Sequence, residues 1–274
     1  MLKPLLLTVG ISLIPGIVDA ETLTLGVVPQ QSAKKLARLW TPVLIYLSEK
    51  SGHQIRFATA KDIPTFEKRL ANSQYDLSYM NPYHYTVFHR SPGYVAFANQ
   101  KDKKIKGIMV VAKDSEVSSL QQLEGQGLAF PSPAAFAASV LPRARLNQDR
   151  ISVRSRYVGS HDSVYLGVAR GFFTAGGGVM RTFNNTAPEV RDKLRVLWTT
   201  DTYTPHAFAA HPRVSSETVA QVRQAMLDMT ADPEGLALLK SLNFKGFQRA
   251  SNEDWDDVRS LGLDLLDGLI RNKQ

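Results

Sequence analysis

The sequence predicts an α/β protein of two lobes, each a mainly parallel sheet flanked by helices, with a ligand cleft between the lobes. Strand and helix patterns alternate three times within residues 22–89, and the alternation returns from residue 105 onward. No Ser/Gly-rich or charged linker separates the two series. Alternating strands and helices are typical of parallel sheets covered by helices. Two such units without a flexible joint indicate lobes that are connected directly by strands.

The first series begins with an alternating, β-branched strand at 22–28. Ser32 is placed to cap a helix over 33–50, whose apolar residues have helical spacing. The following patterns predict strands at 54–59 and 75–80 and helices at 63–71 and 83–89.

The second series contains predicted strands at 105–113, 128–130, 151–158, 172–176 and 194–199. Helices are predicted at 133–146, despite Pro142, and at 161–170. The remaining chain reads as helical over 216–229, 233–242 and 253–272. In the last of these helices an apolar stripe is made by Trp255, Val258, Leu261, Leu265 and Ile270.

These series predict a discontinuous first lobe, 21–107 plus 211–274, and a second lobe at 108–210, with hinges near Gly107 and His211. Open α/β sheets bind ligands at the carboxyl ends of their strands. The loops that follow the predicted strands are therefore the candidate sites: 29–32, 81–83, 131–137, 159–161 and 176–181.

Composition restricts the chemistry. The chain has 274 residues and no cysteine, which excludes disulfides, thiolate metal sites and a cysteine nucleophile. Its 33 Lys and Arg against 25 Asp and Glu give a formal charge of +8, which favours anionic partners. The basic residues are scattered and no DNA-binding pattern occurs, so no nucleic acid partner is expected. No cofactor or metal is expected either, because Gly176-Gly-Gly178 lacks the P-loop lysine and His84 and His89 are spaced wrongly for one zinc-binding helix face.

Residues 1–20 are predicted to be a signal peptide. Lys3 forms the positive start, an apolar stretch follows, and Val18 and Ala20 occupy the −3 and −1 positions of a cleavage site. The alternative is a membrane anchor, but the stretch is short and is broken by Pro15 and Gly16. We therefore expect cleavage after Ala20 and export, most simply to a bacterial periplasm.

The segment 130–138 runs from a strand through a proline-bounded turn into a helix of small residues. Free N–H groups at such a helix start attract an oxyanion, and small side chains allow close approach. The candidate donors are the amides of Ala135, Phe136 and Ala137. The alternative is a close-packed turn that holds no ligand.

Other loops offer polar groups. Ser160 and His161 either bind an anion or cap a helix, and Asn81 and Tyr83 either line a small-molecule pocket or serve as a cap and a core aromatic. Gln31 lies in the loop 29–32, and Arg181 is a candidate anion clamp. A Ser/His/Asp hydrolase is disfavoured because no G-x-S-x-G motif occurs and the neighbouring His161 and Asp162 cannot orient each other as triad members do.

Taken together, these segments resemble the periplasmic substrate-binding proteins of phosphate/phosphite/phosphonate ABC transporters, within the type 2 periplasmic binding proteins. The resemblance covers nearly all of the chain after residue 20. Its landmarks are LGVVP at 25–29, NPY at 81–83, GIMVVAKDS at 107–115, GSHD at 159–162 and DPEGLALL at 232–239.

The resemblance implies lobes that close over a ligand, a ligand donor at His161 and a pocket wall at Tyr83. It also implies a monomer that is not an enzyme and that delivers a small anion to an ABC permease. Two alternatives remain: a sensory module for a membrane histidine kinase, and a hydrolase. The chain departs from the family at 135–137, where Ala-Phe-Ala replaces a Ser-Thr-Ser run, and it lacks the acids that hold an aminophosphonate's amine. We therefore expect backbone donors and, beside Phe136, an organic rather than an inorganic anion.

Overall fold

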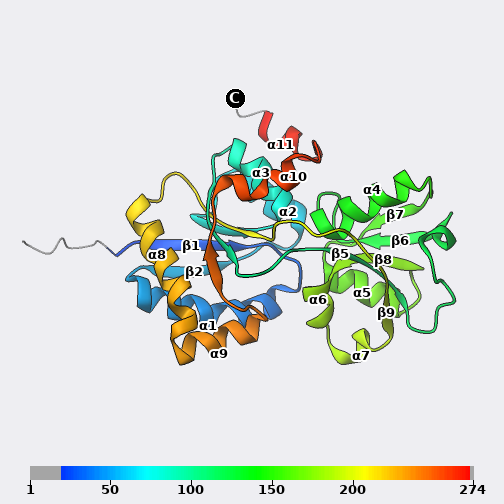
Figure 1. Cartoon of the computed structure of the whole chain (residues 1–274), viewed down its shortest axis with the longest axis horizontal. Helices are drawn as coiled ribbons and strands as arrows, with labels where there is room; N and C mark the ends of the chain where they lie inside the picture. Colours follow the sequence, from blue (N-terminus) through cyan, green and yellow to red (C-terminus); the bar gives the residue numbers. More distant parts are fainter. Residues whose placement is uncertain (1–19, 272–274) are drawn as a thin grey trace, which may run out of the picture.

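The computed structural model of the chain describes residues 20–271, so the predicted signal peptide lies outside the described residues apart from Ala20. The chain forms two sheets that lie side by side along the long axis of the molecule, each flanked by helices (Figure 1). This arrangement confirms the predicted α/β fold class.

The first sheet has six strands in the order β11-β4-β10-β3-β1-β2. Their bounds are β1 Thr22–Val27, β2 Gln54–Ala58, β3 Leu77–Met80, β4 Val95–Gln100, β10 Ala207–Ala210 and β11 Phe247–Arg249. Strand β1 pairs in parallel with β2 and β3, whereas β10 is antiparallel to both β3 and β4. Strand β11 completes the sheet antiparallel to β4.

The second sheet has five strands in the order β7-β6-β8-β5-β9. Their bounds are β5 Gly107–Ala112, β6 Gly127–Phe130, β7 Arg154–Tyr157, β8 Ala175–Val179 and β9 Leu194–Thr199. Strand β6 is parallel to β7 and β8, and β5 is antiparallel to β8 and β9. Both sheets are thus mixed rather than mainly parallel, because the strands next to the crossings between the sheets run against their neighbours.

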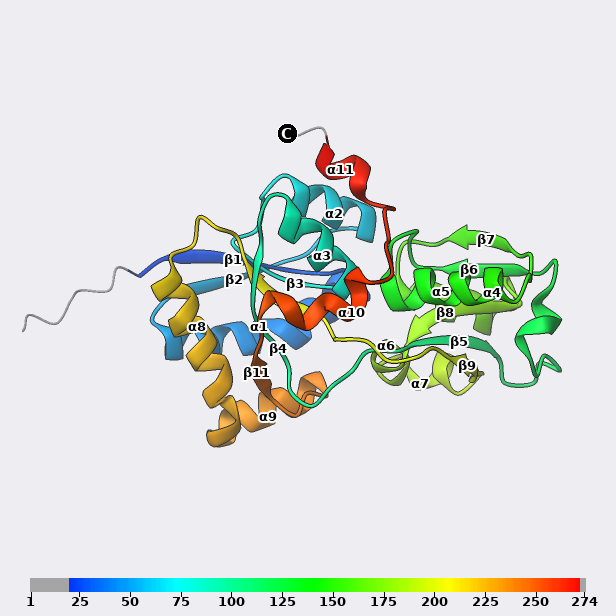
Figure 2. The ribbon, with the colours of Figure 1, turned by 45° about the horizontal axis from the view of Figure 1, so that its top comes forward.

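Helices cover both faces of each sheet (Figure 2). In the first half they are α1 Ala33–Ser51, α2 Ile63–Ala71, α3 Pro82–Arg90, α8 Ser216–Asp228, α9 Pro233–Leu242, α10 Asp256–Arg259 and α11 Asp267–Arg271, with 3-10 turns at Met229–Ala231 and Asn252–Trp255. In the second half they are α4 Leu141–Gln148, α5 His161–Ala169, α6 Met180–Asn184 and α7 Pro188–Arg191, with a 3-10 turn at Leu120–Leu123 and a π-helical turn, η2, at Phe136–Val140.

Local sequence explains where these helices begin. Side chains at the N-caps accept backbone N–H groups that have no partner within the helix. The capping residues with such a bond are Ser32, Asp62, Asn81, Ser160, Ser215 and Asp232. Helix α1 ends at Gly52, whose φ of 78° is left-handed backbone that glycine adopts without a steric penalty.

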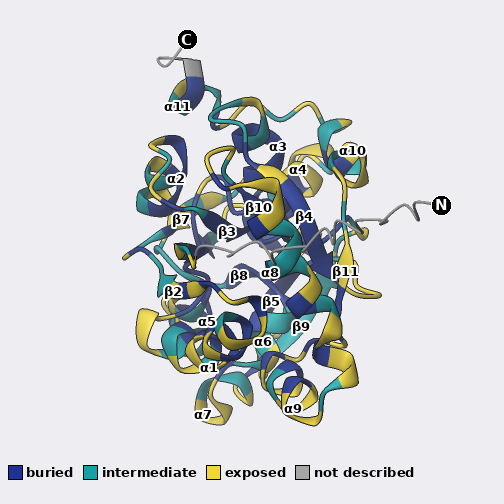
Figure 3. Cartoon of the chain, turned by 90° about the vertical axis from the view of Figure 1, so that its left-hand side faces the viewer, coloured by how far each residue is buried: buried dark blue, intermediate teal, exposed yellow. Residues whose placement is uncertain are grey.

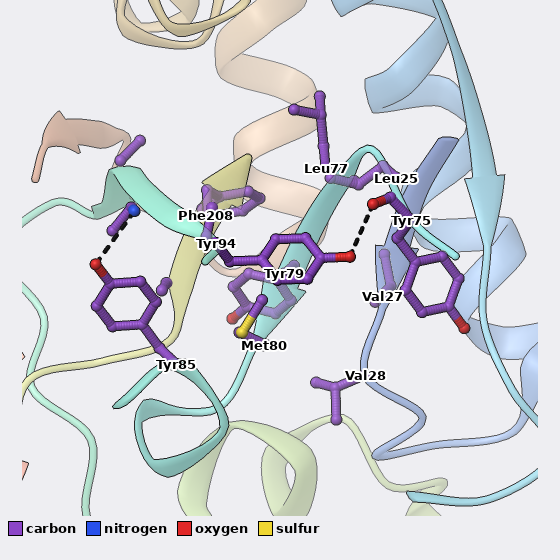
Figure 4. Close-up of a cluster of buried hydrophobic side chains, with 14 of the residues drawn as sticks. Leu25, Val27, Val28, Tyr75, Leu77, Tyr79, Met80, Tyr85, Tyr94 and Phe208 are labelled. Carbon is purple, nitrogen blue, oxygen red and sulfur yellow. Dashed lines mark hydrogen bonds between the residues drawn. The ribbon is translucent and has the colours of Figure 1, made fainter. Parts of the chain in front are cut away.

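The cores lie between the sheets and their helices. The central strands of both sheets are mostly buried, whereas the edge strands β2, β7, β9 and β11 are largely intermediate or exposed. Figure 3 shows that α8 and α9 turn exposed faces outward. In the first half Tyr79 packs against Trp40 and Phe208, with ring centroids 5.0 and 4.6 Å apart. Figure 4 shows Tyr79 and Phe208 together with the Tyr94 hydroxyl, which donates to the Tyr75 carbonyl over 2.8 Å.

Several predicted elements are wrong in extent. The helix predicted at 133–146 begins at Phe136 with the wide π-helical turn, and Pro142 lies in the first turn of α4. The strand predicted at 172–176 is β8 at Ala175–Val179, because glycines rather than bulky residues fill this closely packed strand, while Phe172 is 71% exposed. The single helix predicted at 253–272 is broken, with Gly262 at a φ of 60° between α10 and α11.

Three strands, β4, β10 and β11, were not predicted. The chain passes between the sheets at 101–106 and again at 200–206, where Ile105 and Tyr203 exchange two backbone hydrogen bonds of 2.8 Å. Because β10 pairs with β3 and β4, its four residues belong to the first sheet, ahead of the expected boundary at residue 211.

Candidate functional site

A small cavity lies between the two halves, at the ends of β1 and β3 and beside the start of η2. Its polar lining comes from Gln30, Asn81, His161 and His206, and its apolar lining includes Val28, Ile63, Ile105 and Val179. The backbone at 135–138 completes the wall. The free volume is about 10 Å³, roughly the space of one water molecule. Among the described residues, no carboxylate lines this cavity.

The start of η2 presents backbone donors here. The N–H of Ala135 donates to Ser132 O over 3.4 Å, but no backbone or side-chain acceptor in the described chain receives the N–H groups of Phe136, Ala137 and Ala138. These are first-turn amides, which have no intrahelical acceptor. The free donors are therefore shifted by one residue from the expected set of Ala135, Phe136 and Ala137.

Two glycines bring η2 this close to the second sheet. A β-carbon at Gly107 would lie 1.8 Å from Ala137 O, and one at Gly177 would lie 1.9 Å from Ala138 O. Both strands therefore require glycine at these positions. The close approach of the Ala137 and Ala138 carbonyls to Gly107 and Gly177 determines how near the η2 amides lie to the sheet.

His161 is the first residue of α5 and is 1% exposed. Its Nδ1 lies 3.0 Å from Thr182 Oγ1, and Thr182 is in turn 2.8 Å from the Tyr165 hydroxyl. Burial, reinforced by the nearby Arg181 charge, lowers the pKa of His161 to about 3, so the imidazole is neutral near pH 7. The single Thr182 hydroxyl proton can be donated either to Val179 O, over 3.0 Å, or to His161 Nδ1. In the second arrangement the imidazole proton is on Nε2, for which the described residues provide no partner.

Gln30 links three elements around the cavity. Its Oε1 accepts a hydrogen bond from Arg181 Nη2, and its Nε2 lies 3.1 Å from His206 Nε2. Because an amide NH₂ can only donate, His206 accepts at Nε2 and carries its proton on Nδ1. Burial also lowers the pKa of His206 well below its usual value, with Arg181 adding to the shift. His206 is stacked on Tyr79 with ring centroids 4.9 Å apart.

Further bonds hold the halves together. The Asp162 carboxylate accepts from Gln31 Nε2 over 3.3 Å and from Ser32 N over 3.1 Å. Asn81 Nδ2 donates to Ala134 O over 3.4 Å while its Oδ1 caps α3. The cavity is thus enclosed by residues of both halves that contact one another directly.

Three of the expected site residues face elsewhere. Tyr83 is buried beneath α11, where its hydroxyl accepts the Leu266 N–H over 3.0 Å, so it does not line the cavity. Ser160 caps α5 through a 3.2 Å bond from Ser163 N, as the alternative reading had it. Gln31 is buried and donates to Asp162, and it does not line the cavity, whereas its neighbour Gln30 does.

The remaining expected residues gather here. Asn81, His161, Ala135, Phe136 and Ala137 line the cavity, and Arg181 reaches its edge through Gln30. Sequence reasoning missed Gln30, Ala138, Thr182 and His206. The loop that contains Gln30 was among the candidate loops. His206 was missed because it directly precedes β10, a strand that the sequence pattern did not predict.

Neither a metal site nor a membrane-spanning helix is evident in the described part of the chain. Residues 20–271 contain no group of three or more His, Asp or Glu side chains arranged to hold a metal ion. Within the same range, no helix combines the length and the apolar character that crossing a bilayer requires.

Solved structures share this architecture. A binding protein component of an ABC phosphonate transporter from Pseudomonas aeruginosa superposes with a TM-score of 0.81 at 17% identity, covering 89% of this chain and 86% of that one. PhnD1 from Prochlorococcus marinus in complex with methylphosphonate gives a TM-score of 0.80 at 19% identity, covering 88% and 97%. A Xanthomonas citri protein bound to ATP gives 0.68 at 17% identity, covering 91% and 97%.

Two mixed sheets with helices on their faces are the fold of the type 2 periplasmic binding proteins. More specifically, the chain belongs to the family described as ABC transporter, phosphonate, periplasmic substrate-binding protein, whose model matches residues 25–255. A curated relative, the probable ABC transporter phosphite binding protein PhnD1 of P. marinus strain MIT 9301, is 21% identical over 197 residues. That match covers 64% of this chain and 66% of the relative, just under two thirds of the relative's length. The resemblance inferred from the sequence is confirmed.

Proposed function

We propose that this protein captures a small organophosphonate in the periplasm, after removal of an N-terminal signal peptide, and delivers it to an ABC permease as a monomer. It acts by binding rather than by turnover. The observation that carries the proposal is the set of three free amides at Phe136, Ala137 and Ala138 beside His161, around a cavity that no carboxylate of the described chain lines. The family match and the methylphosphonate complex of PhnD1 support this choice of ligand.

The amides and the imidazole suit the phosphonyl oxygens. Backbone N–H groups at a helix start, with the helix dipole behind them, stabilise negative charge without a counter-charge. In the tautomer whose proton is on Nε2, the neutral imidazole of His161 adds one directed donor, and the Thr182 hydroxyl then donates to Nδ1 rather than to Val179 O. Phe136, whose ring packs edge-on against Tyr203 at 5.3 Å, supplies an apolar surface for the carbon substituent.

Ligand entry requires the halves to separate. The free volume of about 10 Å³ holds no more than a water molecule, and a phosphonyl group is larger. We infer that the two halves act as lobes that turn about the paired segments at 101–106 and 200–206. On closure over the ligand, Arg181 exchanges its bond with Gln30 for one with a phosphonyl oxygen.

The test is a calorimetric titration series on the mature chain with methylphosphonate, ethylphosphonate, phosphite, phosphate, sulfate and acetate. We expect saturable binding of the alkylphosphonates, tighter than that of phosphate, with the ligand recovered unchanged. A ligand at 100 times its Kd should also raise the free energy of unfolding by about 2.7 kcal/mol. Tighter binding of phosphate than of every organic anion, or hydrolysis of a phosphonate, would overturn the proposal.

A further inference from the structure

A second and larger cavity adjoins the first one. The two share Ile105, Val179 and His206 in their walls, and the second has a free volume of about 100 Å³. It lies where the crossing segment 101–106 passes the start of α6. A ligand group too long for the first cavity therefore extends into this adjoining space.

Cationic side chains surround this second cavity. Its lining contains Lys103, Lys104, Lys106 and Arg181, and within the described residues no Asp or Glu lines it. Asp257 lies near Lys104 but outside the lining, and its carboxylate also accepts from the Thr204 amide over 2.7 Å.

Two of the four cationic side chains already form hydrogen bonds within the described chain, and two do not. Lys104 Nζ donates to Thr204 Oγ1 over 3.0 Å and lies 3.8 Å from Asp257. Arg181 bonds Gln30. Lys103 and Lys106, in contrast, form no hydrogen bond or ion pair through their side chains with any residue in 20–271. Two ammonium groups are thus available beside the cavity.

The cavity also has an apolar wall. Tyr79 and Met180 both line it, and the Tyr79 ring is held in place by its stacking on His206. A short carbon chain that leaves the first cavity past His206 therefore runs along apolar surface before it reaches the lysines.

We infer that this second cavity receives an anionic group at the far end of the ligand, so that the preferred substrates are phosphonates with a short carbon chain ending in a second negative charge. This inference rests on the proposed function, because it requires the phosphonyl group to occupy the first cavity. Opposite charges attract and a cationic lining repels an ammonium group. The charge at the far end therefore sets the order of preference: anionic, then uncharged, then cationic.

The experiment compares three phosphonates of similar length: 3-phosphonopropionate, n-butylphosphonate and 3-aminopropylphosphonate. At low ionic strength we expect 3-phosphonopropionate to bind at least about tenfold more tightly than butylphosphonate and the amine to bind most weakly. The preference should shrink as salt is added, since exposed charges are screened.

The variant Lys103→Gln/Lys106→Gln tests the assigned groups. It should reduce the preference to below about threefold while leaving the affinity for methylphosphonate unchanged, because methylphosphonate does not reach the lysines. Lys113→Gln/Lys193→Gln is the matched control, since it removes the same net charge at the far end of β5, and it should keep the preference.

The outcomes separate the two proposals. Methylphosphonate binding with no preference for the anionic end, or a preference that survives in Lys103→Gln/Lys106→Gln, overturns the inference and leaves the proposed function standing. Failure of every phosphonate to bind overturns both.

Discussion

The backbone N–H of His161 donates to the carbonyl oxygen of Gln30 over 2.9 Å, and this bond joins the two halves of the molecule. His161 opens α5, so its amide has no acceptor within the helix. Gln30 lies in the loop after β1, in the other half. In the proposed opening of the halves, both groups would lose this partner beside the cavity.

His161→Ala should weaken the binding of methylphosphonate about ten- to hundredfold, because one hydrogen bond to a charged group contributes about 1.5–3 kcal/mol. Titration calorimetry measures the change. Thr182→Val should give a smaller loss, since it removes only the group that orients Nδ1. If His161→Ala binds like the wild type, the imidazole merely fills space beside the cavity.

Asp162→Ala should lower affinity without touching the ligand. Its carboxylate joins the halves through Gln31 and Ser32, so its loss favours the open form by about 0.5–1.5 kcal/mol, about two- to tenfold in Kd. Small-angle scattering of the ligand-free protein should show a larger radius of gyration. Asp192→Ala is the control, because within residues 20–271 the Asp192 carboxylate pairs only with its neighbour Arg191. Equal effects of the two variants would argue against this role.

Gly177→Ala should reduce both stability and affinity. Its β-carbon would lie 1.9 Å from Ala138 O and 2.7 Å from the Phe130 ring, and such overpacking typically costs about 1–3 kcal/mol. The displaced η2 would carry the free amides away from the ligand. Gly127→Ala is the matched control in the same sheet, because its β-carbon meets nothing within 4 Å. Urea unfolding and methylphosphonate titration measure the two effects, and a Gly177→Ala protein as stable as Gly127→Ala would contradict the prediction.

Stability should fall as the pH drops below about 6.5, before the carboxylates titrate. Burial lowers the pKa of His161 to about 3 and that of His206 well below the ordinary value of 6.5. At a pH between the lowered pKa of the folded state and the ordinary pKa of 6.5, the unfolded chain binds protons that the folded chain does not. The free energy of unfolding therefore rises with pH and levels off above about 6.5. Urea unfolding at about pH 7.5, 6 and 5 should show a flatter profile for His206→Gln than for the wild type. Parallel profiles would mean that His206 does not contribute.

Tyr83→Phe should leave phosphonate affinity unchanged and lower stability by about 1 kcal/mol. The hydroxyl accepts the Leu266 amide, Tyr83 is not part of the cavity lining, and burial raises the pKa of Tyr83 to about 12. Thermal melting and titration together check this. A loss of affinity in Tyr83→Phe would restore the role that the family resemblance had implied for Tyr83.

The sequence alone predicts those helices and strands whose capping residues and apolar spacing lie within the element itself. Caps such as Ser32 and the spacing of Leu36 and Trp40 identify α1 without tertiary information, because one helix face must be buried. Strand β10, Ala-Phe-Ala-Ala, has no alternation and is stabilised only by β3 and β4, which lie more than 100 residues away. Strand β8 is rich in glycine, which disfavours strands locally but is required here by η2 at Gly177 and by side chains of α5 at Gly176 and Gly178.

The site was predicted in part for the same reason. The free amides near Phe136 and the donor His161 follow strands, so their loops could be identified from the sequence. The sequence does not indicate, however, which side chains of a loop face the cavity. Gln30 lines the cavity and Gln31 does not. The structure places Tyr83 outside the cavity lining because the segment at 260–266 folds back over α3, a contact between distant parts of the chain.

The two ends of the second half lie next to each other. Gly107 N donates to Thr200 Oγ1 over 2.8 Å, and Thr200 N donates to Gly107 O over 3.0 Å. The five strands between these residues form a whole sheet, so residues 107–200 are a continuous insertion with adjoining ends. Such a segment can be exchanged as a unit between related proteins, because only the two neighbouring chain connections at residues 107 and 200 have to be matched. A chimera of this kind would transfer the amides of η2 and the imidazole of His161 to another protein, whereas Gln30 and His206 would not be transferred. The groups on the two sides of the cavity could therefore change independently of each other in evolution.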